Sequence, residues 1–587
     1  MAMRVPVFGS ADAAVQGDQS QRSILADLIV GVTVMLGLWA LVMLGRRMSG
    51  PIDMVGTPTT LDTDPALLPY YAGRSLLRMF LALIPSTIFA LVYGYAAARS
   101  RRAEKVLVPL LDILQSVPVL GFLSITLTFW LALVPGREFG VELASIFAIF
   151  TAQAWNMAFA FYQSTKSEPR HFDEVARMLR LTKWQRFWKL DVPNGMIPLV
   201  WNGMMSFGGA WFFLVASEVI AVNNEEYALP GIGSYMAAAS EHQQMGRIAL
   251  AIVVMVAMVV AVNFLFWRPL TAWSEKFRTG DTATTEQKSM VLTVLQRSAI
   301  PAMAATIWAP VAAGLDRVTR PLGLTDRPLR VDERRRRVVD VVLAIILGII
   351  LAYGLVEMLL YLNNSAGLGE FLTAAGLGLL TFARVAVLLV IATLIWVPVG
   401  LWIGLNPKVT RFAQPVIQVL ASFPANFLFP FVTLFLLWSH IPLGIGGIFL
   451  MALGAQWYIL FNVIAGASAI PGDLKEVVAD LRMSKWQVWK RLYLPAIFPG
   501  WVTGIIAAAG GAWNASIVAE IVSYGDTTLI APGLGSYIAQ ATMVGDFART
   551  LIGVVVMAVF VVGLNRMVFK RLYDLAERRY ALGEATG

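Results

Sequence analysis

Long apolar runs alternate with short polar segments along almost the whole chain. Because a helix needs about 20 apolar residues to cross the hydrocarbon core of a bilayer, each run of this length predicts a transmembrane helix. Twelve runs qualify, six on either side of a mixed polar stretch: 23–45, 76–98, 108–134, 141–162, 196–222 and 247–269, then 338–361, 379–405, 413–438, 444–465, 497–522 and 548–569. The pattern therefore predicts an all-α polytopic membrane protein with about twelve spans.

The second set of spans repeats the first. Residues 174–193 and 476–495 align at an offset of 302 (476 − 174) and are identical at nine of twenty positions. At the same offset, Pro230-Gly-Ile-Gly-Ser-Tyr235 matches Pro532-Gly-Leu-Gly-Ser-Tyr537. Since each half has an even number of spans, the two six-helix repeats are predicted to run parallel, related by an axis along the membrane normal.

This repeat divides the chain into five parts. We predict a disordered N-terminus at 1–22, a first repeat at 23–270, a linker at 271–337, a second repeat at 338–572 and a tail at 573–587. Within the linker, the apolar stretch 300–315 contains two prolines, so an interfacial helix is a better reading than a span.

Lys and Arg predict which side of the membrane each loop occupies. The loops at 362–378, 439–443 and 523–547 contain neither residue, whereas the loops on the other side of the second half are basic. The first half shows the bias less cleanly, because Arg46, Arg47 and Arg74 fall on the opposite side. The overall bias predicts a membrane protein whose two termini, linker and two repeated loops, 174–193 and 476–495, are cytoplasmic.

Composition excludes several classes of site. The chain is 58% hydrophobic and only 14% charged, and its net charge of +9 follows from the loop bias rather than from nucleic-acid binding. It has no cysteine and three scattered histidines, so we expect no metal or thiol site. No Gly-x-x-x-x-Gly-Lys-Ser/Thr sequence occurs, so we expect no nucleotide cofactor in this chain and no enzyme activity of its own.

The two repeated loops are basic and lie between apolar runs. Each is predicted to be a short amphipathic helix, a turn at Thr182 or Ser484, and a second short helix that stops at Pro193 or Pro495. Such a loop suits either the surface of a partner protein or the lipid headgroups. Because the same spacing recurs at equivalent places, we favour a docking surface for a partner.

The loops resemble the EAA loop of ATP-binding-cassette (ABC) importer permeases, which reads Glu-Ala-Ala, then Gly, then Ile-x-Leu-Pro. Glu174-Val-Ala176 and Glu476-Val-Val478 stand for the first element, and Leu190-Asp-Val-Pro193 and Leu492-Tyr-Leu-Pro495 for the last. Arg180 and Arg482 stand where the family has Gly, which adopts a left-handed turn more cheaply. Ser-Lys-Trp-Gln and Gly-Leu-Gly-Ser-Tyr add a likeness to the nitrate, sulfonate, taurine and bicarbonate group.

The resemblance implies a type I importer permease fold and a set of partners. Two copies of a separate ABC ATPase, which carry ATP and Mg, would dock on the two loops, and an extracytoplasmic solute-binding protein would deliver a small oxyanion. The implied docking residues are Glu174, Ala176, Arg180, Lys183, Trp184, Pro193, Glu476, Arg482, Lys485, Trp486 and Pro495.

Polar and aromatic residues inside the spans are candidates for the translocation path or its gate. They are Trp155, Trp211, Glu218, Trp457, Trp513 and Glu520. For the tryptophans the alternative is core packing. For the glutamates it is a carboxylate that caps local backbone or pairs across the pseudo-twofold axis. Ser116-Val-Pro118 and Ser422-Phe-Pro424 are predicted to kink or break their helices.

Three functions remain open at this point. The first is the membrane pore of an ATP-driven oxyanion importer. The second is an ion-coupled secondary transporter with parallel repeats, in which Glu218 and Glu520 would couple the ion. The third is a membrane scaffold without transport. Loss of uptake on reversing the charge of Glu174 and Glu476 would favour the first, and loss of ion dependence on neutralising Glu218 and Glu520 the second.

Overall fold

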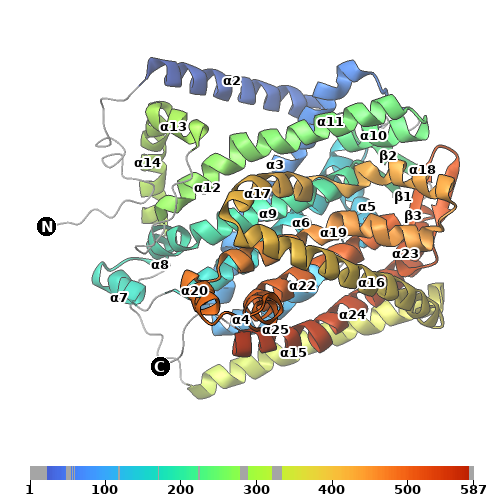
Figure 1. Ribbon diagram of the computed structural model, residues 1–587. Coiled ribbons are helices and arrows are strands. Elements are labelled where there is room, and N and C mark those ends of the chain that lie inside the picture. The colour runs from blue at the N-terminus through green and yellow to red at the C-terminus, as the bar shows by residue number, and fades with distance from the viewer. Residues whose placement is uncertain are drawn as a thin grey trace.

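The protein is an elongated bundle of helices with two small hairpins at one end (Figure 1). The computed structural model describes residues 23–580, except 48–49, 51–54, 56, 58–59, 117–118, 169–170, 223–224, 278–288 and 320–332. The predicted disordered N-terminus at 1–22 lies outside this part of the chain. The all-α prediction is confirmed, apart from two antiparallel strand pairs that the sequence did not indicate.

The first half is built from a continuous series of helices. In order they are η3 (Pro65–Leu67), α3 (Leu68–Arg99), α4 (Arg101–Ser116), η4 (Val119–Phe122), α5 (Leu123–Leu133), α6 (Glu138–Lys166), α7 (His171–Met178), α8 (Lys183–Arg186), η5 (Phe187–Asp191), α9 (Val192–Glu218), β1 (Val219–Val222), β2 (Glu225–Ala228), α10 (Ile232–Glu241), α11 (Met245–Val262), η6 (Asn263–Trp267), α12 (Arg268–Ser274) and η7 (Glu275–Phe277).

The second half repeats this order. Its elements are α16 (Glu370–Leu405), α17 (Pro407–Ser422), η9 (Ala425–Leu428), α18 (Phe429–Ser439), α19 (Leu443–Ser468), α20 (Gly472–Asp480), α21 (Lys485–Val488), η10 (Trp489–Tyr493), α22 (Leu494–Ala519), β3 (Ile521–Tyr524), β4 (Thr527–Ile530), α23 (Leu534–Met543), α24 (Phe547–Leu564), η11 (Asn565–Phe569) and α25 (Lys570–Tyr580).

Four further helices belong to neither repeat. They are α2 (Ile24–Arg47), α13 (Met290–Arg297), α14 (Ile300–Val318) and α15 (Glu333–Ser365). Ser298 and the backbone N–H of Ala299, between α13 and α14, both donate to Asp27 of α2, at 2.8 and 2.6 Å. The apolar stretch of the linker is therefore a helix, as predicted. Its Pro301 lies in the first turn, where a missing N–H costs nothing.

Among the described residues, eight helices are long and apolar enough to cross a membrane, and nine if one sharply bent pair counts as a span. They run over Pro65–Arg99, Glu138–Lys166, Lys183–Glu218, Met245–Phe277, Glu370–Leu405, Leu443–Ser468, Lys485–Ala519 and Phe547–Ala576. The predicted spans 23–45 and 338–361 fall on α2 and α15, where several side chains lie outside the description, so they stay predictions.

The predicted spans at 108–134 and 413–438 are each divided at the predicted proline break, and the pair in the second half counts as one bent span or as none. In the second half, α17 and the helix that follows it are bent by 80° at the Ser422-Phe-Pro424 break. In the first half, α4 ends at Ser116 and η4 begins at Val119. Proline has no N–H and restricts the residue before it, so each helix stops there, as the prolines predicted.

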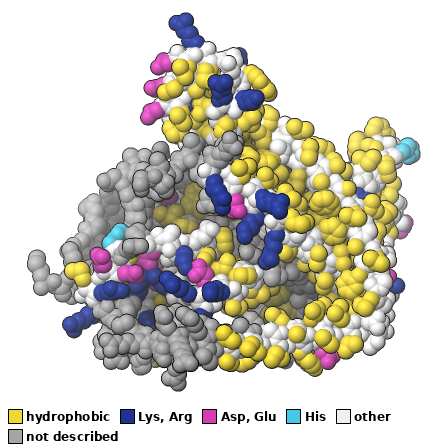
Figure 2. All heavy atoms as spheres, turned by 90° about the horizontal axis from the view of Figure 1, so that it is seen from below, with side chains coloured by type: hydrophobic (Ala, Val, Ile, Leu, Met, Phe, Trp, Pro, Cys, Tyr) yellow, Lys and Arg dark blue, Asp and Glu magenta, His cyan; other side chains and the backbone are white. Residues whose placement is uncertain are grey.

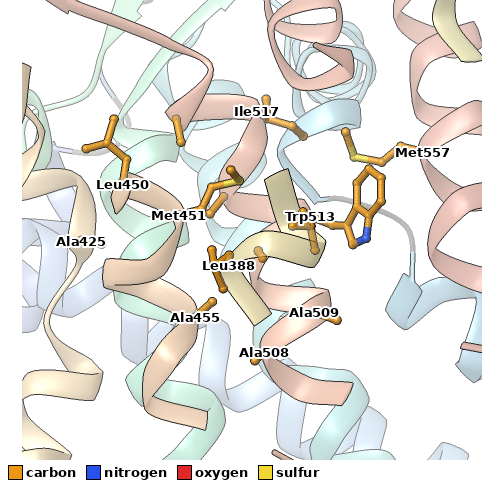
Figure 3. Close-up of a cluster of buried hydrophobic side chains, with 14 of the residues drawn as sticks. Leu388, Ala425, Leu450, Met451, Ala455, Ala508, Ala509, Trp513, Ile517 and Met557 are labelled. Atoms are coloured by element: carbon orange, nitrogen blue, oxygen red, sulfur yellow. The ribbon is translucent and has the colours of Figure 1, made fainter. Parts of the chain in front are cut away.

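Each half packs its long helices around small residues and a tryptophan. In the second half, Trp513 is 1% exposed and lies among Leu388, Met451 and Met557 (Figure 3). Ala508 and Ala509 lie one turn away on α22 and allow the close approach of its neighbours. Membrane helices pack in this way because small residues let backbones approach and gain dispersion contacts.

The two ends of the bundle differ in charge. Lys and Arg side chains gather toward the end where α7, α8 and α20 lie, and hydrophobic side chains cover most of the remaining face in view (Figures 1 and 2). The hairpins β1–β2 and β3–β4 lie at the opposite end. The molecule therefore has a basic end that carries both repeated loops, an apolar middle, and an end that carries both hairpins.

Candidate functional site

The first repeated loop is a helix, a left-handed turn and a capped second helix. After α7, Arg180 has φ +48°, and the backbone N–H of Leu181 donates to the carbonyl of Ala176 at 3.0 Å. Thr182 then caps α8. Its hydroxyl accepts from the Gln185 N–H at 3.1 Å, and the Gln185 side chain accepts from the Thr182 N–H at 3.2 Å. This reciprocal capping box satisfies two helix-end donors.

The second loop has the same backbone. Arg482 has φ +46°, and Ser484 and Gln487 make the same capping box at 3.4 and 3.0 Å. A residue with a Cβ pays about 1 kcal/mol for the left-handed region. Both arginines nevertheless occupy the position and conformation of the family's glycine. The side chain departs from the motif, but the turn does not.

The prediction that Pro193 and Pro495 stop the second short helix is wrong. In each loop a π-helical turn, η5 or η10, joins the short helix to the long one, so Lys183–Glu218 and Lys485–Ala519 are each continuous. The N–H of Val192 donates five residues back to Phe187, and that of Leu494 to Trp489. The wider π turn precedes a proline that has no N–H to donate, so the helix continues past it.

The predicted docking residues divide into a framework and a surface. Ala176 is fully buried, and Pro193 and Pro495 are partly buried at the start of their long helices. The side chains of Glu174, Lys183, Glu476 and Lys485 are exposed, as are both left-handed arginines. The two tryptophans differ. Trp184 packs on Phe187 and Trp188, whereas Trp486 is 72% exposed.

An ion cluster fixes the first loop to the body of the protein. Arg186 contacts Asp173 of α7, Glu168 at 3.3 Å and the buried Asp191 at 3.5 Å. Arg99, at the end of α3, contacts Glu168 and Asp191 as well. Five charged groups from four segments thus meet beneath the loop, and the geometry of α7 relative to α9 follows from them.

The second loop has none of these charges. At the aligned positions stand Leu405, Ile470, Lys475, Val488 and Tyr493. Sequence reasoning did not find the cluster. Its members are scattered over about 90 residues (99–191), and only the fold brings them together. The two loops therefore share a backbone and differ in how firmly they are held.

A second ion pair holds the start of α4 to the end of α6 in the first half. Lys166 Nζ contacts Glu104 Oε2 at 2.6 Å, and the Tyr162 hydroxyl donates to Glu104 Oε1 at 2.8 Å. These hydrogen bonds, from Lys166 first and then Tyr162, lower the pKa of Glu104 below its ordinary value. Glu104 is therefore a carboxylate at neutral pH.

At the hairpin end, Glu218 holds together three segments of the first half. Its carboxylate accepts from Ser75 at 2.5 Å and Arg78 at 2.7 Å on α3, and from the Gly233 N–H at 2.6 Å. Arg78 also contacts Glu142 of α6 through two atoms, at 2.6 and 2.7 Å. All these side chains are fully buried. We call this arrangement the outer clasp.

Glu520 makes the matching clasp in the second half. It accepts from Thr381 at 2.8 Å, Arg384 at 2.6 Å and the Gly535 N–H at 2.8 Å. Here the Gly444 carbonyl, which accepts from Arg384 at 3.1 Å, stands at the position of Glu142. Each glutamate pairs within its own half, not across the pseudo-twofold axis.

The clasps explain the repeated Pro-Gly-x-Gly-Ser-Tyr sequence. A Cβ built on Gly231 would overlap the carboxyl group of Glu218, and one on Gly533 would overlap that of Glu520. The sequence is therefore the start of α10 or α23, wrapped around a buried carboxylate. The partners Arg78 and Arg384 were missed, although an arginine at equivalent places in two apolar runs is a visible signal.

The four tryptophans predicted for the path pack among helices. Trp211 and Trp513 are each 1% exposed. Trp155 contacts Phe89 of α3, with ring centroids 5.4 Å apart, and Trp457 contacts Trp396 of α16 at 5.6 Å. Glu218 and Glu520 are fully buried in the clasps. The assignment of these six residues to the path stays a prediction.

Comparison with known proteins finds the same duplication. Residues 88–268 and 396–582, together well over half of the chain, each match the family described as "Binding-protein-dependent transport system inner membrane component". The bicarbonate transport system permease protein CmpB of Synechococcus elongatus is 31% identical over 223 residues, which cover 38% of this chain and 74% of that protein.

Two further relatives carry other transport names. The nitrate import permease protein NrtB of Synechocystis is 29% identical over 208 residues, covering 35% of this chain and 70% of that protein. The putative aliphatic sulfonates transport permease protein SsuC of Bacillus subtilis is 27% identical over 194 residues, covering 33% and 60%. Each match is about the size of one repeat, so the chain is similar to two such proteins joined in one.

Proposed function

Because the chain belongs to the family of binding-protein-dependent transport system inner membrane components, we propose that its two halves form the complete pore of an ATP-driven importer. One chain then supplies both docking loops that such a pore needs. The observation that carries the proposal is the identity of the two loop backbones, including a left-handed arginine and a capping box in each.

Each loop receives one ATPase subunit in this proposal. The exposed Glu174 and Lys183, and their counterparts in the second loop, contact the ATPase surface, while buried Ala176 keeps the first helix seated. ATP and Mg are bound by the ATPases, whose closure pushes both loops. Because π turns join the loops to α9 and α22 without a break, a push on a loop moves a long helix directly.

The orientation follows from the same assignment. ATP is cytoplasmic, so the basic end with the loops and both termini faces the cytoplasm. The hairpin end faces outward and receives a solute-binding protein. The solute crosses unchanged, and no bond of it is made or broken.

The substrate class we propose is a small oxyanion. Relatives of the chain are named for bicarbonate and nitrate, and a further one for sulfonates. All three are small anions with several oxygen atoms, and a pore shared by such relatives has to accept that chemistry.

The outer clasps argue against the ion-coupled carrier. A coupling carboxylate has to release and take up its ion during transport. Glu218 and Glu520 each have an arginine, a hydroxyl and a backbone N–H as partners, and both are fully buried. They hold the hairpins and the short helices in place and leave no free carboxylate for coupling.

Native mass spectrometry of the chain co-expressed with the ATPase encoded beside it tests the proposal. The expected complex holds one copy of this chain and two ATPases. The double variant Glu174→Lys, Glu476→Lys should lose both ATPases, and Asp526→Lys, an exposed charge reversal on the hairpin end, should retain them. A chain that appears alone, or as its own dimer without ATPase, would overturn the importer assignment.

A further inference from the structure

Two amide side chains are exposed where the protein crosses the membrane. Gln115 lies at the end of α4, and Asn156 lies in the middle of α6, 18 residues after the helix begins (156 − 138). Both side chains are exposed, and the amide nitrogen of Gln115 lies 3.2 Å from the amide oxygen of Asn156. Exposed amides are costly against lipid, so their position calls for an aqueous surface.

The same region contacts the second half. Four residues after Gln115, the backbone N–H of Val119 donates to Asn514 Oδ1 of α22 at 3.1 Å. Asn514 Nδ2 in turn donates to the carbonyl of Gly510, one turn earlier, at 3.1 Å. The start of η4, which follows α4, thus contacts α22 across the boundary between the halves.

Gly510 faces open space. A Cβ built on it would meet no atom within 4 Å, although it lies inside the long helix α22 and next to buried Ala509 and Ala512. Thr503, two turns earlier on the same face of the helix, is exposed. This face of α22 therefore lines a space between the halves rather than a packed interface.

Tyr458 borders the same space. Its ring lies 3.3 Å from a Cβ built on Gly511, and its hydroxyl lies 3.2 Å from a Cβ built on Gly209 of the other half. It therefore lies between the two Gly-Gly pairs, close to the pseudo-twofold axis, and its side chain is partly exposed. The repeat places Tyr458 at the position of Asn156 in the first half.

We propose that Gln115, Asn156, Tyr458 and Asn514 form the site that a small oxyanion occupies while it passes between the two halves. The inference rests on the proposed function and deepens it by naming the residues that meet the substrate. Contacts between described residues link Gln115 to Asn156, α4 to Asn514 through Val119, and Tyr458 to the glycine pairs of both halves.

The chemistry of this site suits an anion in transit. Each amide nitrogen carries two N–H donors, so the bond between Gln115 and Asn156 leaves one donor on the first and two on the second. With the Tyr458 hydroxyl, these donors match the oxygens of a trigonal or tetrahedral anion. None of the four side chains is charged, so the anion is bound by hydrogen bonds and can leave again.

The site is built asymmetrically. At the positions equivalent to Gln115, Asn156 and Asn514, the other half has Ala421, Tyr458 and Phe212. A single polar surface therefore forms from unlike residues of the two halves. One chain that holds both halves ensures this pairing, which a symmetric dimer of either half would lose.

Cysteine accessibility tests the location without requiring transport. The chain has no cysteine, so single variants Gln115→Cys and Asn156→Cys each carry one thiol. Both should react with a membrane-impermeant, sulfonate-bearing thiol reagent, and 50 mM nitrate or bicarbonate should slow the reaction. Val253→Cys, an exposed apolar position on α11, is the lipid-facing control and should react at least 10-fold more slowly. Equal rates at all three positions would overturn the inference.

Transport in proteoliposomes tests the role. With ATPase and binding protein present, Asn156→Asp should lower nitrate and bicarbonate uptake at least 10-fold because a fixed negative charge repels the anion. Asn156→Ser should stay within about 3-fold, and both should keep the stimulated ATPase rate. Equal uptake by Asn156→Asp and wild type would refute the site. If wild type moves neither anion while the labelling pattern holds, the proposed substrate fails and the aqueous location stands.

Discussion

The outer clasp of the first half makes the strongest prediction about stability. Arg78 is fully buried and contacts Glu142, Glu218 and the Pro230 carbonyl at 2.6–3.0 Å. Replacing Arg78 with Met removes the cation, so the buried carboxylates of Glu142 and Glu218 lose part of the positive charge that neutralises them. Breaking a buried pair in this way costs about 3–5 kcal/mol, because one charge stays behind without its partner.

A double-mutant cycle gives the sharper readout. Arg78→Met and Glu218→Gln each break the same contact, so the second change costs less once the first is made. We expect a coupling free energy of about 1–3 kcal/mol. The measurement is thermal unfolding in detergent at a fixed scan rate, and each single variant should lower the midpoint by about 2–4 °C.

The second half supplies the comparison. Arg384 contacts one carboxylate, Glu520, and two backbone carbonyls, and its side chain is 12% exposed. Arg384→Met leaves one buried carboxylate rather than two and should cost about half as much as Arg78→Met. Additive effects of Arg78→Met and Glu218→Gln, or equal costs in the two halves, would refute the reasoning from buried charge.

Three further predictions concern the docking loops. Arg186→Val removes one of the two cations of the ion cluster and leaves Arg99. Hydrogen exchange across 171–191 should therefore speed up about 10-fold and approach that of the second loop; unchanged exchange would mean that Arg186 does not hold the loop. The double variant Arg180→Gly, Arg482→Gly should preserve ATPase binding. It should raise the stability of the loops by about 1 kcal/mol or less, because glycine avoids the cost of the left-handed conformation but adds conformational freedom to the unfolded chain. Limited proteolysis measures this stability, and faster cleavage of the loops would contradict the prediction. Trp486→Ala should weaken ATPase binding about 10-fold, or about 1.4 kcal/mol, and Trp184→Ala should weaken it less than 3-fold. The reason is that the exposed indole of Trp486 is free to enter a pocket on the ATPase. Titration calorimetry that shows the reverse order would contradict the proposed role of Trp486 in docking.

The architecture was predicted well wherever the sequence pattern lay within one continuous segment of the chain. The repeated loop and its turn at Thr182 and Ser484 follow from local patterns, and the structure agrees. The break in the third predicted span of each half was predicted from its proline. Hydropathy reports that a stretch is apolar, but it does not report whether the helix is straight, so the 80° bend after α17 was not predicted.

The sites were harder to predict because their members lie far apart in the chain. The ion cluster joins Arg99 to Asp191, and each clasp joins residues about 140 positions apart. The path prediction shows a second limit. Trp155 and Trp457 are the immediate neighbours of Asn156 and Tyr458 on their helices. One residue is about 100° of rotation, so the site that we propose lies at the depth of these tryptophans but on another face of each helix. An aromatic side chain inside a span gives no sign of which way it points.

Comparison of the two halves separates framework from function. Where both halves need the same backbone, they keep the same groups: the glutamate–arginine clasp around a Gly-x-Gly turn, the capping box and the left-handed arginine. Where the two halves differ, the differing residues lie on surfaces that we propose contact an ATPase or the substrate. The ion cluster and the exposed Trp486 distinguish the docking loops, and Asn156 against Tyr458 distinguishes the walls between the halves. A homodimer has to use one surface for both positions. Fusion removes that constraint, so each loop and each wall of this protein is free to suit a different contact.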